Sequence, residues 1–183
     1  MLIIGGITFG LLFLQKSSVD IQKKQEEEQT CAIEKKLYTV RGVSMSPVIH
    51  QEEDITMYEG YYDCNPVEHG DIVAYQYAGN KNPIIKFVKA IPGDAFTLRR
   101  KDDNAVWNIV INGAIVKNSE GKEYEIDERE QKMLSLYITD YKGHIPEGAY
   151  LLLGNTYTGS MDSTEFGFAS GKNIMGKVVR IHQ

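Results

Sequence analysis

The chain has 183 residues, enough to bury a hydrophobic core, and its content of 42% hydrophobic and 10% aromatic residues is that of a globular protein rather than a disordered one. The formal net charge is −5, and the lysines and arginines are scattered along the chain. Nucleic-acid-binding proteins instead concentrate basic residues in a patch, so we expect no nucleic-acid partner. One domain with an N-terminal appendage is the expected organisation.

The appendage begins with an apolar run from Leu2 to Leu14 that only Thr8 interrupts. A charged stretch follows, so the sequence predicts a membrane anchor over residues 1–15 and a stalk over residues 16–36. The run is shorter than the ~20 residues of a full membrane span, unless the true start of the protein lies upstream. The alternative is a cleaved secretory signal, although a basic leading region and a small-x-small cleavage site are missing.

Residues 37–183 read mainly as β-strands, because β-branched and aromatic residues recur between glycine, proline and asparagine breaks. Asn112-Gly113 lies between two apolar runs and predicts a tight hairpin. Residues 127–137 have helical spacing, and we expect them to form a packing insert rather than a site. The fold class is therefore mostly β. The expected strands are 36–40, 55–58, 71–77, 83–91, 95–99, 107–116, which includes the hairpin, 149–153 and 174–181.

Ser44 and Lys86 form a candidate catalytic pair. A serine hydroxyl becomes a good nucleophile only when a neighbour accepts its proton, and lysine can do so only when neutral. With an ordinary pKa near 10.4, roughly one lysine in a few thousand is neutral at pH 7, and lowering the pKa by about three units costs about 4 kcal/mol. In a strand, Lys86 would share one face with Ile84 and Val88, and such an apolar environment lowers the pKa of an amine.

Each residue of the pair also has a simpler interpretation. Lys86 could be a solvated lysine that protects a strand edge from aggregation. Ser44 lies in Gly42-Val43-Ser44-Met45-Ser46-Pro47, where serine and proline could form an ordinary turn. Against this, Pro47 disfavours a helix at the preceding residue, and Gly42 has no side chain, so the segment is expected to be extended and exposed.

Other kinds of site have little support in the sequence. The four histidines, His50, His69, His144 and His182, stand apart from one another, and an isolated histidine is more often structural than catalytic. Cys31 and Cys64 are too few and too far apart for a zinc cluster, and there is no glycine-rich phosphate loop. We therefore expect no cofactor and no metal.

Four segments in this order resemble the motif boxes of the type I signal peptidases. Lys86 precedes Asp94 of a Pro-Gly-Asp turn by eight residues, as the lysine of that family does. The similarity extends over about residues 37–181. The segments are Gly42 to Pro47, His69-Gly70-Asp71-Ile72-Val73, Lys86 to Asp94, and Gly154 to Phe168.

The resemblance implies roles for individual residues. Ser44 would be the nucleophile and Lys86 the general base, as in the bacterial branch of the family rather than the endoplasmic-reticulum branch, which has histidine at the lysine position. Ser160 would orient the lysine, and Asp162 and Ser163 would support the site. Met45 would pack behind the nucleophile. The backbone N–H of the nucleophile would stabilise the oxyanion, and Gly42 stands where some members supply a second, hydroxyl donor.

The chain also departs from the family pattern in the residues around the site. The fourth box usually begins Gly-Asp-Asn and has arginine after Asp-Ser, whereas this chain has Asn155, Thr156 and Thr164. Val48 replaces a threonine and Phe87 replaces an arginine. Asp162 is therefore expected to lack its usual ion-pair partner, which could loosen the geometry of the site.

The resemblance implies a membrane-anchored serine endopeptidase that removes N-terminal signal peptides from exported preproteins. The fold would be a coiled antiparallel sheet or a small open barrel with an N-terminal apolar helix. Signal peptides and membrane lipid would be its partners, and the catalytic domain would lie on the extracytoplasmic side of the cell membrane. The positions of Lys16, Lys23 and Lys24 after the apolar run give the opposite orientation signal.

Two alternatives remain at this level. The chain could be a specialised maturation peptidase of the same family, for example one that processes pilus subunits. A self-cleaving repressor with a Ser-Lys pair is not expected, since it would carry a DNA-binding head where this chain has the apolar run. The second alternative is a catalytically inactive, membrane-tethered β domain that binds extended peptides, which the altered fourth box leaves open.

Overall fold

The computed structural model describes residues 31–183 except residues 80–81, 102–104, 157–158 and 182–183. The expected membrane anchor, its apolar helix and most of the charged stalk lie outside the described residues. Within the described ranges, no helix combines the length and the apolar character needed to cross a membrane. Residues 33–183 form one body with its own internal contacts.

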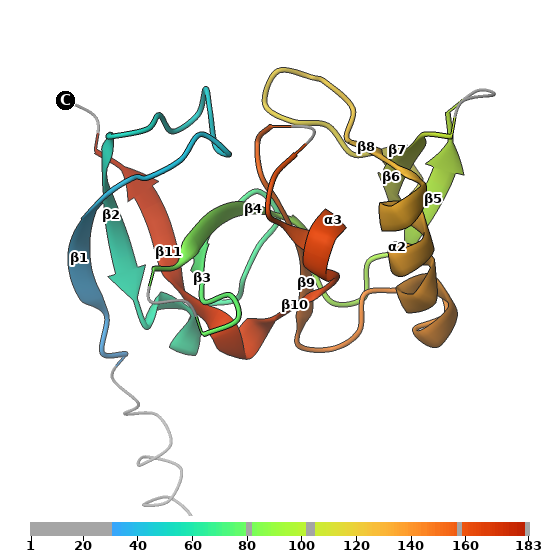
Figure 1. Ribbon diagram of the computed structural model, residues 1–183. Helices are drawn as coiled ribbons and strands as arrows, with labels where there is room; N and C mark the ends of the chain where they lie inside the picture. The colour runs from blue at the N-terminus through green and yellow to red at the C-terminus, as the bar shows by residue number, and fades with distance from the viewer. Residues whose placement is uncertain (1–30, 80–81, 102–104, 157–158, 182–183) are drawn as a thin grey trace, which may run out of the picture. The chain divides into compact units, whose positions relative to one another are not determined.

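A seven-stranded antiparallel sheet forms the larger part of this body (Figure 1). Its strands lie in the order β1, β2, β11, β3, β4, β9, β10, so the two ends of the sheet are β1 and β10 and the sheet does not close into a barrel. The strands are β1 (Glu34–Thr39), β2 (Asp54–Glu59), β3 (Ile72–Tyr75), β4 (Ile84–Ala90), β9 (Ala149–Leu153), β10 (Ala169–Ser170) and β11 (Ile174–Arg180).

A second, four-stranded antiparallel sheet contains the predicted hairpin. Asn112 and Gly113 at its tip have φ angles of 50° and 83°, as a tight hairpin turn requires. The helix α2 (Glu128–Asp140) follows, and Asp127 caps its first turn together with Glu130. The strands of this sheet are β5 (Phe96–Arg100), β6 (Trp107–Ile111), β7 (Ala114–Ile115) and β8 (Glu125–Ile126).

Three clusters of buried apolar residues hold these elements together. One joins the smaller sheet, α2 and β9, and includes Phe96, Leu134 and Leu151. A second lies under the loop between β1 and β2, around Met45 and Ile49. The third packs around β3 and β4. Because β4 and β9 pair with each other and residues of both strands belong to these clusters, the two strands are firmly supported.

The mostly β fold with antiparallel sheets is confirmed, and the predicted strands and the helix agree with the structure to within a few residues. Short elements were not predicted, because two to four residues carry too little periodicity to be recognised. Besides β8 and β10, these are η1 (Tyr61–Asp63), α3 (Ser163–Phe166) and η2 (Gly171–Asn173).

Candidate active site

Ser44 lies in the loop of residues 40–49 that connects β1 to β2, hereafter the nucleophile loop. The loop turns sharply instead of running extended as predicted, because Ser46 N–H donates to Val43 O across 3.0 Å and Ile49 N–H donates to Met45 O across 3.0 Å. Gly42 opens the turn with a φ of 97°, a conformation that favours glycine. The turn leaves Val43 exposed and Ser44 half-buried.

Met45 packs beneath the loop. Only 2% of its surface is exposed, and it belongs to the same apolar cluster as Val40 and Ile49. Since the side chain of Met45 is fixed in the core, the backbone at the neighbouring Ser44 is held in place as well.

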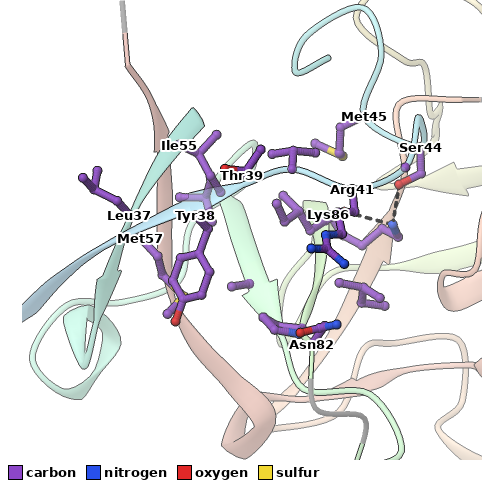
Figure 2. A pocket seen from close by; sticks show the side chains of 17 residues that line it. Leu37, Tyr38, Thr39, Arg41, Ser44, Met45, Ile55, Met57, Asn82 and Lys86 are labelled. Carbon is purple, nitrogen blue, oxygen red and sulfur yellow. Dashed lines mark hydrogen bonds between the residues drawn. The ribbon is translucent and has the colours of Figure 1, made fainter. Parts of the chain in front are cut away.

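Lys86 lies on β4, in register with Val73 of β3. The alternation of side chains places it on the same face as Val88, and Lys86 and Val88 are 2% and 0% exposed. The solvated-lysine alternative is therefore wrong. Lys86 Nζ donates hydrogen bonds to Ser44 Oγ across 2.8 Å and to Ile85 O across 2.9 Å. Figure 2 shows Lys86 pointing toward Ser44.

The electrostatic environment favours a neutral amine at Lys86. Burial lowers the pKa of Lys86 to about 8 from its ordinary value of 10.5, and the negative charge of Asp162 partly opposes this shift. With a pKa of about 8, about one molecule in ten has a neutral lysine at pH 7, compared with about one in three thousand for an exposed lysine. The amine can therefore accept a proton near neutral pH.

Asp162 and Ser163 of the fourth motif box bind the backbone of β9 and of the residue that follows it. Asp162 and Ser163 are 2% and 0% exposed. Asp162 Oδ2 accepts a hydrogen bond from Gly154 N–H across 2.8 Å, and Ser163 Oγ accepts one from Leu152 N–H across 2.9 Å. Both side chains thus hold the start of α3 against β9.

Ser160 is buried beside these residues, with 6% of its surface exposed. Within the described part of the chain, its hydroxyl has no hydrogen-bond partner. The two hydrogen bonds of Lys86 Nζ go to Ser44 and Ile85 instead. An orienting role for Ser160 stays a prediction from the family resemblance.

Thr164, which occupies the position of the family's arginine, binds Asp162 by hydrogen bonds instead of an ion pair. Its backbone N–H and its hydroxyl each donate to Asp162 Oδ1 across 3.0 Å. Together with Gly154 N–H, these donors satisfy both oxygens of the carboxylate, and Asp162 caps α3. The loss of the arginine is therefore offset in hydrogen bonding, but no opposite charge replaces it at this position.

Asn155 is a residue whose importance the sequence analysis missed, because it was noted only as a departure from the family motif. It is 1% exposed, and its backbone N–H donates to Ser44 O across 2.6 Å. An asparagine that follows a buried strand is a weak signal for such a contact, since asparagine is equally common in loops.

A cavity of about 570 Å³ opens beside the Ser44–Lys86 pair (Figure 2). The end of β1 and the nucleophile loop line it on one side, and residues 82–86 line it on the other. Most of its side chains are apolar, among them Leu37, Ile55 and Met57. The cavity is therefore suited to hold an extended peptide with the Ser44 hydroxyl within reach.

The remaining candidate groups lie elsewhere or have other partners. His69 pairs with Asp94 at 2.6 Å and does not line the cavity. Cys31 and Cys64 are both disulfide-bonded, so neither is a metal ligand or a nucleophile. In the part of the chain that the structure describes, no three His, Cys, Asp or Glu residues are grouped to hold a metal ion.

The sequence of this chain is similar to those of known proteins. Residues 30–182 match the model of a family described as signal peptidase, peptidase S26. The chain belongs to this signal peptidase family. Signal peptidase I of Bacillus caldolyticus is 28% identical over 144 residues, which cover 77% of this chain and 75% of the relative. Signal peptidase IB of Staphylococcus aureus (strain COL) is 28% identical over 148 residues, covering 77% and 74%.

A solved signal peptidase I structure from Enterococcus faecalis V583 is also similar, with 23% identity and a TM-score of 0.42 over 62% of this chain and 97% of that one. The S26 signal peptidases are serine endopeptidases, so this chain is a hydrolase of that class.

Proposed function

We propose that this signal peptidase cleaves N-terminal signal peptides from exported preproteins with Ser44 as the nucleophile and Lys86 as the general base. The observation that carries the proposal is the 2.8 Å contact between Ser44 Oγ and Lys86 Nζ, made by a lysine with 2% of its surface exposed. Membership of the signal peptidase family supports the substrate class.

In the first half of the reaction, neutral Lys86 takes the proton of the Ser44 hydroxyl while Ser44 Oγ attacks the carbonyl carbon of the scissile peptide bond. The negative charge then moves to the carbonyl oxygen, where the backbone N–H of Ser44 is the expected donor. As the C–N bond breaks, the Lys86 ammonium gives its proton to the leaving amine. The mature protein departs, and the signal peptide stays as an ester on Ser44.

In the second half, Lys86 is neutral again and accepts a proton from water, which attacks the ester carbonyl. The C–O bond to Ser44 breaks, the proton returns to Ser44 Oγ, and the signal peptide leaves with a free carboxylate. Each proton that Lys86 accepts is given back within the same half-reaction. Ser160 is proposed to orient Lys86 through these transfers, and Asp162, Ser163 and Met45 to hold the surrounding backbone.

The substrate is proposed to bind as an added strand beside the end of β1. This strand is one end of the seven-stranded sheet, and an extended peptide can pair with such an edge. The apolar lining of the cavity suits the small, apolar side chains that precede a signal-peptide cleavage site.

A location outside the cytoplasm fits two features of the chain. Cys31 and Cys64 are disulfide-bonded, and disulfides persist mainly in oxidising compartments. The apolar run of residues 2–14 would place the enzyme at the membrane that its substrates cross. We therefore propose a membrane-anchored enzyme with its catalytic domain on the extracytoplasmic face.

Cleavage of a fluorogenic signal-peptide substrate by the purified full-length chain tests this proposal. Ser44→Ala and Lys86→Arg should both abolish cleavage, since arginine does not release its proton near neutral pH. Lys89→Arg is a matched control, because Lys89 lies on the same strand and is also partly buried but hydrogen-bonds Lys117 O. Unchanged cleavage by Ser44→Ala or Lys86→Arg would rule out the pair.

The same assay separates the alternatives. A wild-type chain that binds the peptide but does not cleave it would be the inactive β domain. A panel of unrelated preproteins distinguishes a general signal peptidase, which cleaves most of them, from a specialised maturation peptidase, which cleaves one.

A further inference from the structure

Asn155 contacts the nucleophile loop at two points. Its backbone N–H donates to Ser44 O across 2.6 Å, and its side-chain Nδ2 donates to Ser46 O across 2.8 Å. These two carbonyls lie on either side of Met45, which is fixed in the core below. Thr156 N–H also donates to Ser44 O, across 3.2 Å. The main chain after β9 therefore holds Ser44, and the side chain of Asn155 adds a second point of attachment at Ser46.

The same residue is tied closely to the strand that carries Lys86. On the paired strands β4 and β9, Phe87 lies opposite Leu153. Lys86 is adjacent to Phe87, and Asn155 follows Leu153 by two positions. Asn155 therefore links the strand pair that carries Lys86 to the loop that carries Ser44, and its contacts help to hold Ser44 close to Lys86.

The contact depends on an amide rather than a carboxylate. Besides Ser46 O, Nδ2 donates to Ser119 Oγ across 2.9 Å, and Oδ1 accepts from Ser119 N–H across 2.9 Å. Both hydrogens of the amide and its oxygen are thus used in a site that is 1% exposed. An ionised aspartate, the residue usual in the family, could not donate to Ser46 O and would repel it.

We propose that Asn155 is a positioning residue that holds Ser44 at reacting distance from Lys86 through its side-chain amide. This inference rests on the proposed roles of Ser44 and Lys86. Asn155 does not line the substrate cavity, so it acts on the chemical step and not on peptide binding. The loop at Ser119, remote in sequence from both reacting residues, supports the amide from its other side.

Kinetics of Asn155→Asp and Asn155→Ala in the full-length chain test the inference. Displacing a reacting group by about 1 Å costs about 100-fold in rate, so kcat should fall by about 10- to 100-fold, while KM should change by less than about threefold. Asn108→Ala is the matched control: Asn108 is a buried asparagine, 3% exposed, that donates to Tyr124 O in the smaller sheet. Its kcat should equal that of the wild type.

The fluorescence of Trp107, the single tryptophan, reports whether each variant is folded. If kcat of folded Asn155 variants matches that of Asn108→Ala, or if their defect lies in KM, the inference is wrong. Should neither Asn155 variant fold, Ser119→Ala decides, because Ser119 is exposed and its loss frees one side of the amide. A several-fold fall in kcat at unchanged KM supports the inference, and an unchanged kcat overturns it.

These results are distinguishable from failure of the proposed function. An active Ser44→Ala enzyme would refute the Ser44–Lys86 pair itself. An inactive Ser44→Ala enzyme together with fully active, folded Asn155 variants would refute only the role of Asn155.

Discussion

Lys86 Nζ lies 2.8 Å from Ser44 Oγ although the two residues come from parts of the chain with different surroundings. Both residues line the cavity, but Ser44 is half-buried on the nucleophile loop, whereas Lys86 is buried on β4. This difference suits a nucleophile that must meet a peptide and a base that must lose its charge. It also makes both the activity and the stability of the protein rise with pH through one residue, the activity below a pH of about 8 and the stability between about 8 and 10.5.

The first prediction concerns the pH dependence of cleavage. Because only neutral Lys86 accepts a proton, kcat/KM should rise about tenfold per pH unit below the pKa of Lys86 and level off above it. The structure gives this pKa as about 8. Initial rates across the pH range measure the profile. A flat profile, or one that still rises steeply near pH 10.5, would contradict a buried lysine base.

The second prediction is that Lys86→Met stabilises the protein while abolishing cleavage. Unfolding returns Lys86 from a pKa of about 8 to its ordinary 10.5. Between about pH 8 and pH 10.5 the unfolded state binds more protons than the folded state, so the stability of the wild type rises with pH in this range. Below a pH of about 8 the folded wild type carries the full free-energy cost of a buried charge at Lys86. At pH 7, methionine should therefore raise the free energy of unfolding by up to about 3 kcal/mol.

Urea unfolding followed by Trp107 fluorescence at neutral and at alkaline pH measures this gain, which should shrink as the pH approaches 10.5. Lys132→Met is the control, because Lys132 is exposed on α2 and its loss should give no such pH-dependent gain. A Lys86→Met protein less stable than the wild type at neutral pH would show that the charge of Lys86 is well compensated in the fold.

The sequence predicted the parts of the site that depend on local pattern. Alternation along β4 was enough to place Lys86 beside Val88 in an apolar face, and the spacing of the motif boxes was enough to pair it with Ser44. The long strands and α2 were predictable for the same reason, since each is several residues long and carries its own periodicity.

The remaining features depend on contacts between distant segments. Asn155 looked like a weakened motif, and only the approach of β9 to the nucleophile loop lets its backbone N–H reach Ser44 O and its side-chain amide reach Ser46 O and Ser119. Thr164 looked like the loss of an ion pair, and its hydrogen bonds to Asp162 depend on the cap geometry of α3. The turn of the nucleophile loop was mispredicted because the bonds from Ser46 and Ile49 that close it are invisible in a list of residue types.

The third prediction concerns Gly154, which lies close to Ser44 and Ser160. A Cβ atom added at this position would collide with Ser160 Oγ and lie 2.9 Å from Ser44 O. Gly154→Ala should therefore push the nucleophile loop away from β9 and lower kcat by about 100-fold or more. Gly148→Ala is the control, because a Cβ there meets nothing within 4 Å, although its φ of 70° brings backbone strain of its own. Equal kcat values in the two variants would contradict the prediction, because they would mean that the nucleophile loop accommodates the added Cβ atom without displacing Ser44.

The fourth prediction concerns Asp162, whose charge raises the pKa of Lys86. Asp162→Asn removes that charge, so the pKa of Lys86 should fall and the rising limb of the kcat/KM profile should move to lower pH. The variant should also lose stability, by about 1–3 kcal/mol, because an amide nitrogen would then face a backbone or hydroxyl donor. The pH profile and urea unfolding measure the two effects separately.

Thr164→Val is the control for that experiment. It removes the hydroxyl that donates to Asp162 Oδ1 but leaves the carboxylate charge and both backbone donors in place. Its stability should fall by about 1 kcal/mol, the net worth of one hydrogen bond, and its pH profile should keep the wild-type midpoint. A midpoint that moves upward in Asp162→Asn, or one that moves equally in both variants, would show that hydrogen bonding around α3, and not the charge of Asp162, tunes Lys86.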